Sequence, residues 1–136
     1  MSDTTDRSKQ LVQEFYASAA SGDGAALAAC VHDDFELEEP TCLPYGGTYQ
    51  GLNGLQAALA RVAAVLDFDK LEVESMVADG EQVVVTLRVG VQGSDALVRN
   101  AEHWTVRDGK VWRGRVFTFD PSPVLAAAGA PGSAFA

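Results

Sequence analysis

Two adjacent carboxylates, Glu38 and Glu39, end a short apolar run, and a loop rich in glycine and tyrosine follows at 45–51. Side chains alternate between the two faces of a strand, so one of these carboxylates can enter a pocket. Two further acids, Glu102 and Asp120, lie on later strand-like segments, and we expect them to converge on the same pocket. Acids removed from water bind protons more tightly, which makes them usable as general acids or bases near neutral pH. The alternative interpretation is a solvated acidic surface.

The composition predicts one globular domain with an acidic surface. The chain has 136 residues, of which 47% are hydrophobic, and this is enough for a single packed core. Its 19 acidic and 10 basic side chains give a net charge of -9. Such a charge repels nucleic-acid phosphates and anionic lipid surfaces. We therefore expect neither nucleic acid nor a membrane as a partner.

The N-terminal segment lacks a basic start followed by an apolar run, and no apolar stretch reaches the roughly 20 residues of a membrane-spanning helix. We therefore expect a cytoplasmic protein. Cys30 and Cys42 lack metal-type spacing and a neighbouring pair of histidines, so they are interpreted as structural thiols. A disulfide or a zinc site is the alternative for these cysteines. No metal or cofactor is expected.

The N-terminal half has the spacing of helices. Apolar residues recur every three to four positions over 6–20 and again over 55–66, and the segment 24–31 is interpreted as a short helix between them. A strand is expected at 35–38, with residues 32–34 forming the turn that leads into it.

The C-terminal half has the pattern of strands. Four strand-like runs are predicted, at 71–77, 83–91, 96–106 and 111–119. Two of the connections contain Asp79-Gly80 and Asp108-Gly109, which are dipeptides that adopt positive φ in tight hairpins. The spacing therefore predicts an antiparallel meander.

Together these elements predict an α+β domain. Three N-terminal helices, with the first strand between the second and third, are expected to pack on one face of a curved, mostly antiparallel sheet. The concave side of such a sheet is a natural hydrophobic pocket. We expect a single domain over residues 1–120 and a flexible tail over 121–136, where proline, alanine and glycine predominate.

Several motifs resemble the nuclear transport factor 2-like superfamily, within it the branch of ketosteroid isomerases and SnoaL-like polyketide cyclases. The similarity extends over nearly the whole chain up to Asp120. It is carried by Gln13-Glu14-Phe15-Tyr16, Ser21-Gly22-Asp23, residues 32–40, the loop ending at Gly51, Glu102-His103-Trp104, residues 108–111 and Phe117-Thr118-Phe119-Asp120. The resemblance implies a cone-shaped, cystatin-like fold. It implies no single activity, because this superfamily includes isomerases, cyclases, epoxide hydrolases, dehydratases and non-enzymatic binding domains.

The resemblance also implies roles for individual residues. Glu39 occupies the position of the ketosteroid isomerases' catalytic base, and Glu102 that of a protonated acid that donates to the oxyanion. Their oxyanion-hole tyrosine aligns with Phe15, so this donor is expected to be missing, and Tyr16 lies about 100° around the helix. Losing one such donor costs about a hundredfold or more in rate. In the SnoaL-like cyclases the acid/base is an Asp on the final strand, which Asp120 matches.

Strand alternation gives a separate expectation for the pocket. If Glu102 faces inward, its own strand also turns Val98, Asn100 and Trp104 inward and Arg99, His103 and Thr105 outward. The face of the last strand that carries Asp120 also carries Trp112, Gly114, Val116 and Thr118. The residues expected to contact substrate are Phe15, Tyr16, Tyr45, Tyr49, Asn100, Trp104, Val116 and Thr118. Tyr45 and Tyr49 either pack their loop or form a lid over the pocket.

The leading functional hypothesis is a small-molecule enzyme that transfers protons without a cofactor, as an isomerase or cyclase, on an apolar carbonyl or polyketide-like substrate. Glu39 or Asp120 would be the base and protonated Glu102 the donor. The alternative from another class is a ligand-binding domain without chemistry. Epoxide hydrolysis by an Asp-Arg-Asp arrangement is a third candidate. Strand alternation argues against it, because it places Arg88 and Arg99 on the face opposite Glu102. Cross-strand pairing with an arginine would instead make Glu102 half of an ion pair.

The convex face of the predicted sheet has the composition of a buried interface. Aromatic, β-branched and arginine side chains gather on the strand faces opposite the pocket, at Val84, Thr86, Arg88, Arg99, His103, Thr105, Arg113, Arg115, Phe117 and Phe119. We expect a two-fold symmetric homodimer through this face. Its interface should bury about 1,000 Å² or more in total.

Overall fold

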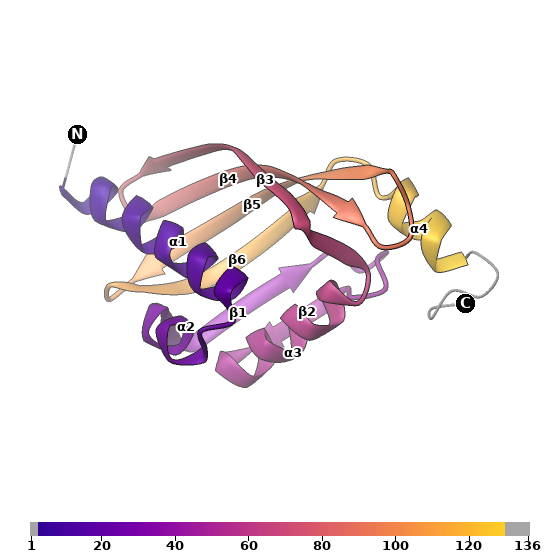
Figure 1. The fold of residues 1–136 in the computed structure, drawn as a ribbon. Coiled ribbons are helices and arrows are strands. Elements are labelled where there is room, and N and C mark those ends of the chain that lie inside the picture. The colour runs from indigo at the N-terminus through magenta and orange to yellow at the C-terminus, as the bar shows by residue number, and fades with distance from the viewer. Residues whose placement is uncertain (1–2, 130–136) are drawn as a thin grey trace.

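The computed structural model describes residues 3–129, which form a curved six-stranded sheet and four helices (Figure 1). The elements follow the order α1 (Asp3–Ser21), α2 (Gly24–Cys30), β1 (Val31–Glu39), β2 (Gly47–Gln50), α3 (Gly51–Ala63), β3 (Leu66–Asp79), β4 (Gln82–Val91), β5 (Leu97–Arg107), β6 (Lys110–Thr118) and α4 (Ser122–Gly129). The α+β class and the place of the first strand between the second and third helices agree with the prediction, whereas β2 and α4 were not predicted.

The sheet is mixed, with the order β2-β1-β6-β5-β4-β3. The strands β3 to β6 form the predicted antiparallel meander, and β1 joins it by parallel pairing with β6. Two expectations for the first strand are wrong: residues 32–34 belong to β1, and part of the expected loop forms β2. Residues 47–50 form β2 because they pair with residues 36–39 of β1 at the edge of the sheet, and residues 32–34 extend β1 across the register shift of its pairing with β6. Such pairing depends on distant segments, so local sequence does not reveal it.

The helices α1 and α3 pack on the same face of the sheet (Figure 1). Their buried side chains recur at helical spacing, as predicted, with Val12 and Phe15 on α1 and Leu55, Ala58 and Val62 on α3. The short helix α2 begins where the Asp23 side chain accepts a hydrogen bond from the Ala26 N–H at 3.1 Å. The sheet curves around α1 and α3, so its concave side faces the helices.

Interruptions of the strand register change which face some side chains occupy. The pairing of β5 with β6 shifts between Thr105 and Val106, next to the turn at Asp108 and Gly109, where both residues have positive φ. The extra residue of such a bulge reverses the alternation beyond it. Trp112, predicted to face the pocket, therefore lies outside, where its ring contacts the guanidinium groups of Arg107 and Arg113.

Part of the segment predicted as a flexible tail is helical. Alanine-rich α4 lies at one end of the sheet, against β4 and β5, and buries Val124 completely (Figure 1). Alanine is the best helix former, and burial of Val124 supplies the packing that a helix this short needs. Residues 130–136 lie outside the described part of the chain. None of the helices within residues 3–129 is long and apolar enough to cross a membrane.

Candidate functional site

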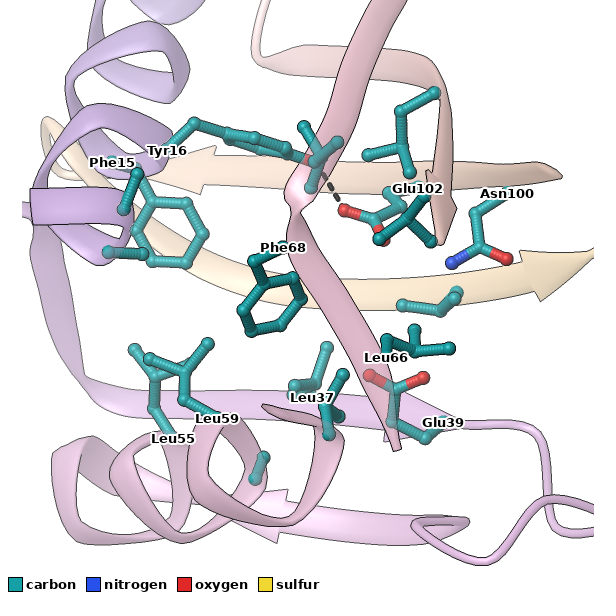
Figure 2. Close-up of a pocket in the computed structure, with 18 of the residues that line it drawn as sticks. Phe15, Tyr16, Leu37, Glu39, Leu55, Leu59, Leu66, Phe68, Asn100 and Glu102 are labelled. Atoms are coloured by element: carbon teal, nitrogen blue, oxygen red, sulfur yellow. Dashed lines mark hydrogen bonds between the residues drawn. The ribbon is translucent and has the colours of Figure 1, made fainter. Parts of the chain in front are cut away.

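A cavity of about 370 Å³ lies between α1, α3 and the concave face of the sheet. This volume suits a small organic ligand. Most of its lining is apolar and comes from both helices and all the strands except β2 (Figure 2). The side chains with polar atoms in the lining are Tyr16, Glu39, Tyr45, Asn100, Glu102 and Trp104. The concave pocket expected from the sequence is therefore present.

Alternation along β1 sends Glu38 and Glu39 to opposite faces, as predicted. Glu38 points outward and accepts a hydrogen bond from Arg115 at 3.0 Å, whereas Glu39 lines the cavity (Figure 2). Glu39 Oε1 is buried and has no hydrogen-bond partner in residues 3–129. Burial, with a smaller contribution from the charge of Glu102, raises the pKa of Glu39 to about 8. The Glu39 carboxyl can therefore gain and lose its proton close to neutral pH.

Glu102 is part of a hydrogen-bonded chain on the opposite wall. The Tyr16 hydroxyl donates to Glu102 Oε1 (Figure 2), and the Trp104 indole Nε1–H donates to the Tyr16 hydroxyl oxygen at 2.9 Å. Burial raises the pKa of Glu102, while the Tyr16 and Asn100 side chains act in the opposite direction. Burial, followed by the charge of Glu102, raises the pKa of Tyr16 above its usual range. Tyr16 is therefore a neutral donor at all ordinary pH values.

A tyrosine hydroxyl reaches the cavity from α1, although the residue at the expected tyrosine position is Phe15. Phe15 and Tyr16 both line the cavity, because helix α1 crosses it with a broad face that also includes Ala19 and Ala20. The Phe15 ring packs edge-on against Trp104, with ring centroids 4.9 Å apart, and Tyr16 reaches past it to Glu102. A tyrosine one position away from the family's usual one can thus supply the hydroxyl.

Asn100 is positioned by a neighbouring strand. The Thr118 hydroxyl donates to Asn100 Oδ1 at 3.0 Å, and Asn100 is 7% exposed. This bond leaves the amide N–H₂ group for the side of the cavity that holds Glu102. Thr118 itself lies outside the cavity lining, so it orients Asn100 and is not a lining residue as expected.

The remaining sequence candidates divide between the cavity and its surroundings. Tyr45 and Val116 line the cavity, but buried Tyr49 does not, because its hydroxyl donates to the Tyr45 carbonyl oxygen at 2.7 Å.

Asp120 is exposed beyond the end of β6, and its carboxylate accepts from the Ser122 backbone N–H at 3.0 Å. Hydrogen bonding with Ser122 holds the pKa of Asp120 below its usual value. The predicted meeting of three acids is therefore wrong for Asp120, and two acids share the cavity.

The arginines that could have neutralised these acids lie on the other face of the sheet. Arg88 pairs with Glu72, Arg99 with Glu74 at 3.8 Å, and Arg115 with Glu38 at 3.0 Å. No arginine of residues 3–129 lines the cavity, so Glu102 is not half of an ion pair there. The same part of the chain contains no cluster of His, Cys, Asp and Glu that could hold a metal ion. Cys30 is buried and Cys42 exposed, and both are free thiols.

The sequence reasoning missed most of the apolar lining. Leu55 and Leu59 come from α3, and Leu66 and Phe68 from β3 (Figure 2). Leu71 of β3 also lines the cavity. The helical spacing of the leucines marked a buried face, but nothing in it distinguished a cavity wall from a packed core. On β3, Leu66 was expected in the preceding helix, which ends at Ala63, and Leu71 at the start of a strand. Two register shifts break the alternation of β3, so the sequence did not show that these residues line the cavity.

Comparison with known proteins identifies the family. A family model described as SnoaL-like domain matches residues 12–114. The chain belongs to this family. Solved structures similar to this SnoaL-like domain include a nuclear transport factor 2-like protein from Burkholderia thailandensis, at 25% identity and a TM-score of 0.77, with 91% of this chain and 98% of that one covered. A comparison with curated proteins finds no match.

Two other structural relatives carry more descriptive names. TerC, solved with polyporic acid, is 26% identical over 88% of this chain and 96% of its own, with a TM-score of 0.72. A Kribbella flavida protein described as a candidate ketosteroid isomerase is 18% identical, with a TM-score of 0.72 and coverage of 85% of this chain and 80% of that one. At that identity the Kribbella protein supports the fold of this SnoaL-like domain and nothing further.

Proposed function

We propose that this SnoaL-like domain is an enzyme that moves a proton on a small, mainly apolar carbonyl compound without a cofactor. The observation that carries the proposal is the arrangement of two acids in one apolar cavity. Glu39 stands on one wall with an unpaired oxygen, and Glu102 stands on the other with the Tyr16 hydroxyl bonded to it (Figure 2). A base and an oxyanion donor facing the same space are what enolisation requires.

Each group has one task in the proposed reaction. Ionised Glu39 removes a proton from the carbon next to the substrate carbonyl, and the C–H electron pair moves into the C–C bond of the enolate. Protonated Glu102, whose Oε1 accepts from the Tyr16 hydroxyl, donates a hydrogen bond from its other oxygen to the carbonyl oxygen, where the negative charge develops. Glu39 then returns its proton to carbon, at the same or another position, and is ionised again. No redox partner is needed.

The pKa values support this division of roles. The pKa of Glu39 near 8 allows the group to exchange protons at physiological pH, whereas the raised pKa of Glu102 favours the protonated form that a donor needs. Two titratable groups with separate environments and different tasks are a recurring feature of enolising enzymes. The relative TerC was solved with polyporic acid, which supports a small organic ligand for the cavity.

Hydrogen–deuterium exchange tests the proposal without a known substrate. Apolar ketones of increasing size are incubated with the protein in D₂O, and loss of the protons next to the carbonyl is followed by ¹H NMR. We expect catalysed exchange for at least one ketone, abolished by Glu39→Gln. The matched control is Glu38→Gln, which removes the neighbouring carboxylate from the outer face and should leave exchange unchanged. Equal exchange in wild type and Glu39→Gln would refute the assignment.

A ligand-binding domain without chemistry is the second candidate. It is favoured by one observation: a Glu39 with a pKa near 8 is largely protonated at pH 7, so the resting cavity is close to neutral. Native mass spectrometry of the freshly purified protein distinguishes the two. Recovery of an apolar ligand, released unaltered and with no exchange for any ketone, would favour the binding domain.

A further inference from the structure

Two buried oxygens in the wall of the cavity have no hydrogen-bond partner. Within residues 3–129 these atoms are Glu39 Oε1 and the Tyr45 hydroxyl oxygen. Tyr45 is only 2% exposed, so water at the protein surface does not satisfy its hydroxyl. Buried polar groups are nearly always paired, because an unpaired one loses its hydration without compensation. Here one unpaired group is a donor and the other an acceptor.

The path of the chain brings the two residues together. Glu39 is the last residue of β1 and lies opposite Gly47 of β2. Between them the chain folds back through hydrogen bonds from Leu43 N to Pro40 O, at 3.1 Å, and from Gly46 N to Leu43 O, at 2.9 Å. Gly46 lies so close to the start of this loop that an added Cβ would be 2.2 Å from Pro40 O. Tyr45 is therefore held next to the strand end that carries Glu39.

The backbone of Tyr45 is fixed from a second side. Its carbonyl oxygen accepts from the Tyr49 hydroxyl at 2.7 Å, and the Tyr49 hydroxyl oxygen accepts from Arg61 at 3.2 Å. The loop is thus anchored, which argues against the lid considered from the sequence. The hydroxyl of Tyr45 is the part of the residue that these contacts leave without a role.

We propose that Tyr45 is a positioning residue for Glu39, whose Oε1 accepts a hydrogen bond from the Tyr45 hydroxyl when the carboxylate is ionised. This inference rests on the proposed function, since it takes Glu39 to be the base. A protonated carboxyl is a weak acceptor, so the two groups can remain apart in the neutral form. Ionisation makes Oε1 a strong acceptor, and charge-assisted hydrogen bonds are about twice as strong as neutral ones. The other carboxylate oxygen is then left for the substrate.

The other groups near Glu39 are already engaged or lie outside the cavity. Across the cavity, Glu102 of β5 and Tyr16 of α1 are bonded to each other. On β6, Arg115 lines an adjacent hollow that also reaches Glu39, but it pairs with Glu38. The remaining titratable neighbour of Tyr45 is the Cys42 thiol. The cavity lining from α3 and β3 is apolar: Leu55, Ala58, Leu59, Val62, Leu66, Phe68, Leu71 and Val73.

Direct titration of Glu39 tests the proposal. Carboxyl carbons of ¹³C-labelled glutamate are followed by NMR between pH 5 and 10, and the Glu39 signal is assigned by its absence in Glu39→Gln. The pKa of about 8 that burial and the charge of Glu102 give Glu39 includes no bond from Tyr45, so we expect the wild-type midpoint below this value. We expect Tyr45→Phe to raise this midpoint by about one pH unit, which is a tenfold smaller ionised fraction at neutral pH. The thermal midpoint at pH 6 should not fall, because the hydroxyl has no partner there. An unchanged or lowered Glu39 midpoint would overturn the proposal.

Tyr49→Phe is the matched control, since it removes a hydroxyl that bonds the Tyr45 backbone and not Glu39. We expect a lower thermal midpoint but an unchanged Glu39 titration. A rise equal to that of Tyr45→Phe would mean that loosening the loop is sufficient, and this would also overturn the proposal. The titration needs no substrate. Ketone exchange that survives Glu39→Gln would refute the proposed function. The NMR titration would still show whether the Tyr45 hydroxyl bonds ionised Glu39, so the two failures are distinguishable.

Discussion

Replacing Glu39 with glutamine should flatten the dependence of stability on pH. Below its unfolded-state pKa, near 4.5, Glu39 is protonated in both states and contributes no pH dependence. At higher pH the unfolded chain releases this proton while the folded protein keeps it, so the free energy of unfolding falls. The fall ends near pH 8, where the folded carboxyl also ionises. Glutamine does not titrate and lacks this contribution.

The size of the effect follows from the pKa difference. One pKa unit corresponds to about 1.4 kcal/mol, so a rise from 4.5 to about 8 is equivalent to about 5 kcal/mol. Between pH 5 and pH 8, the free energy of unfolding of Glu39→Gln should therefore gain about 4 kcal/mol relative to wild type. This is a large part of the 5–15 kcal/mol, roughly, that stabilises a typical domain.

Urea unfolding at pH 5, 6, 7 and 8 measures this change. Only the slope is diagnostic, because a buried glutamine amide also changes the stability by an amount that does not depend on pH. Glu38→Gln is the control: it removes a carboxylate that is paired with Arg115 on the outer face, and should follow the wild-type curve closely. Parallel curves for wild type and Glu39→Gln across this range would refute the argument that burial raises the Glu39 pKa.

Three further predictions concern the donor, the packing and the assembly. Tyr16→Phe should slow ketone exchange by about a hundredfold. It should also raise the pKa of Glu102 further, because the hydrogen bond from the Tyr16 hydroxyl lowers that pKa. Unchanged exchange rates would contradict a role for Tyr16 in stabilising the oxyanion. Gly114→Ala should lower the free energy of unfolding by about 1–3 kcal/mol in urea titrations, since its Cβ would come within 2.1 Å of the Trp104 ring; full stability would mean that the ring has room to move. We propose a homodimer through the convex face, so light scattering at micromolar concentration should give twice the chain mass for wild type and the single mass for Phe117→Asp, whose native phenyl ring is 52% exposed. A monomeric wild type would exclude this dimer.

The sequence alone determined the class of the fold and one half of the site. Periodicity is a local property, so the helical faces of α1 and α3 and the meander of β3 to β6 could be read from it. Alternation separated Glu38 from Glu39 on β1 and placed Asn100, Glu102 and Trp104 on one face of β5, and the structure shows that Glu39 is the glutamate of the pair that lines the cavity. Within a regular strand, two residues of the same parity share a face in any tertiary context.

Only the tertiary structure decided which of these faces meet, and where alternation stops. The bulge between β5 and β6 turns Trp112 outward, and the end of β6 at Thr118 leaves Asp120 at the surface, although both residues have the parity of the pocket face. The Tyr16 hydroxyl reaches Glu102 because α1 crosses the sheet at one particular angle, and helical spacing does not contain that angle. Register shifts and crossing angles depend on packing between segments far apart in the chain, which is why the Tyr16 partner of Glu102 and the unpaired oxygen of Glu39 had to come from the structure.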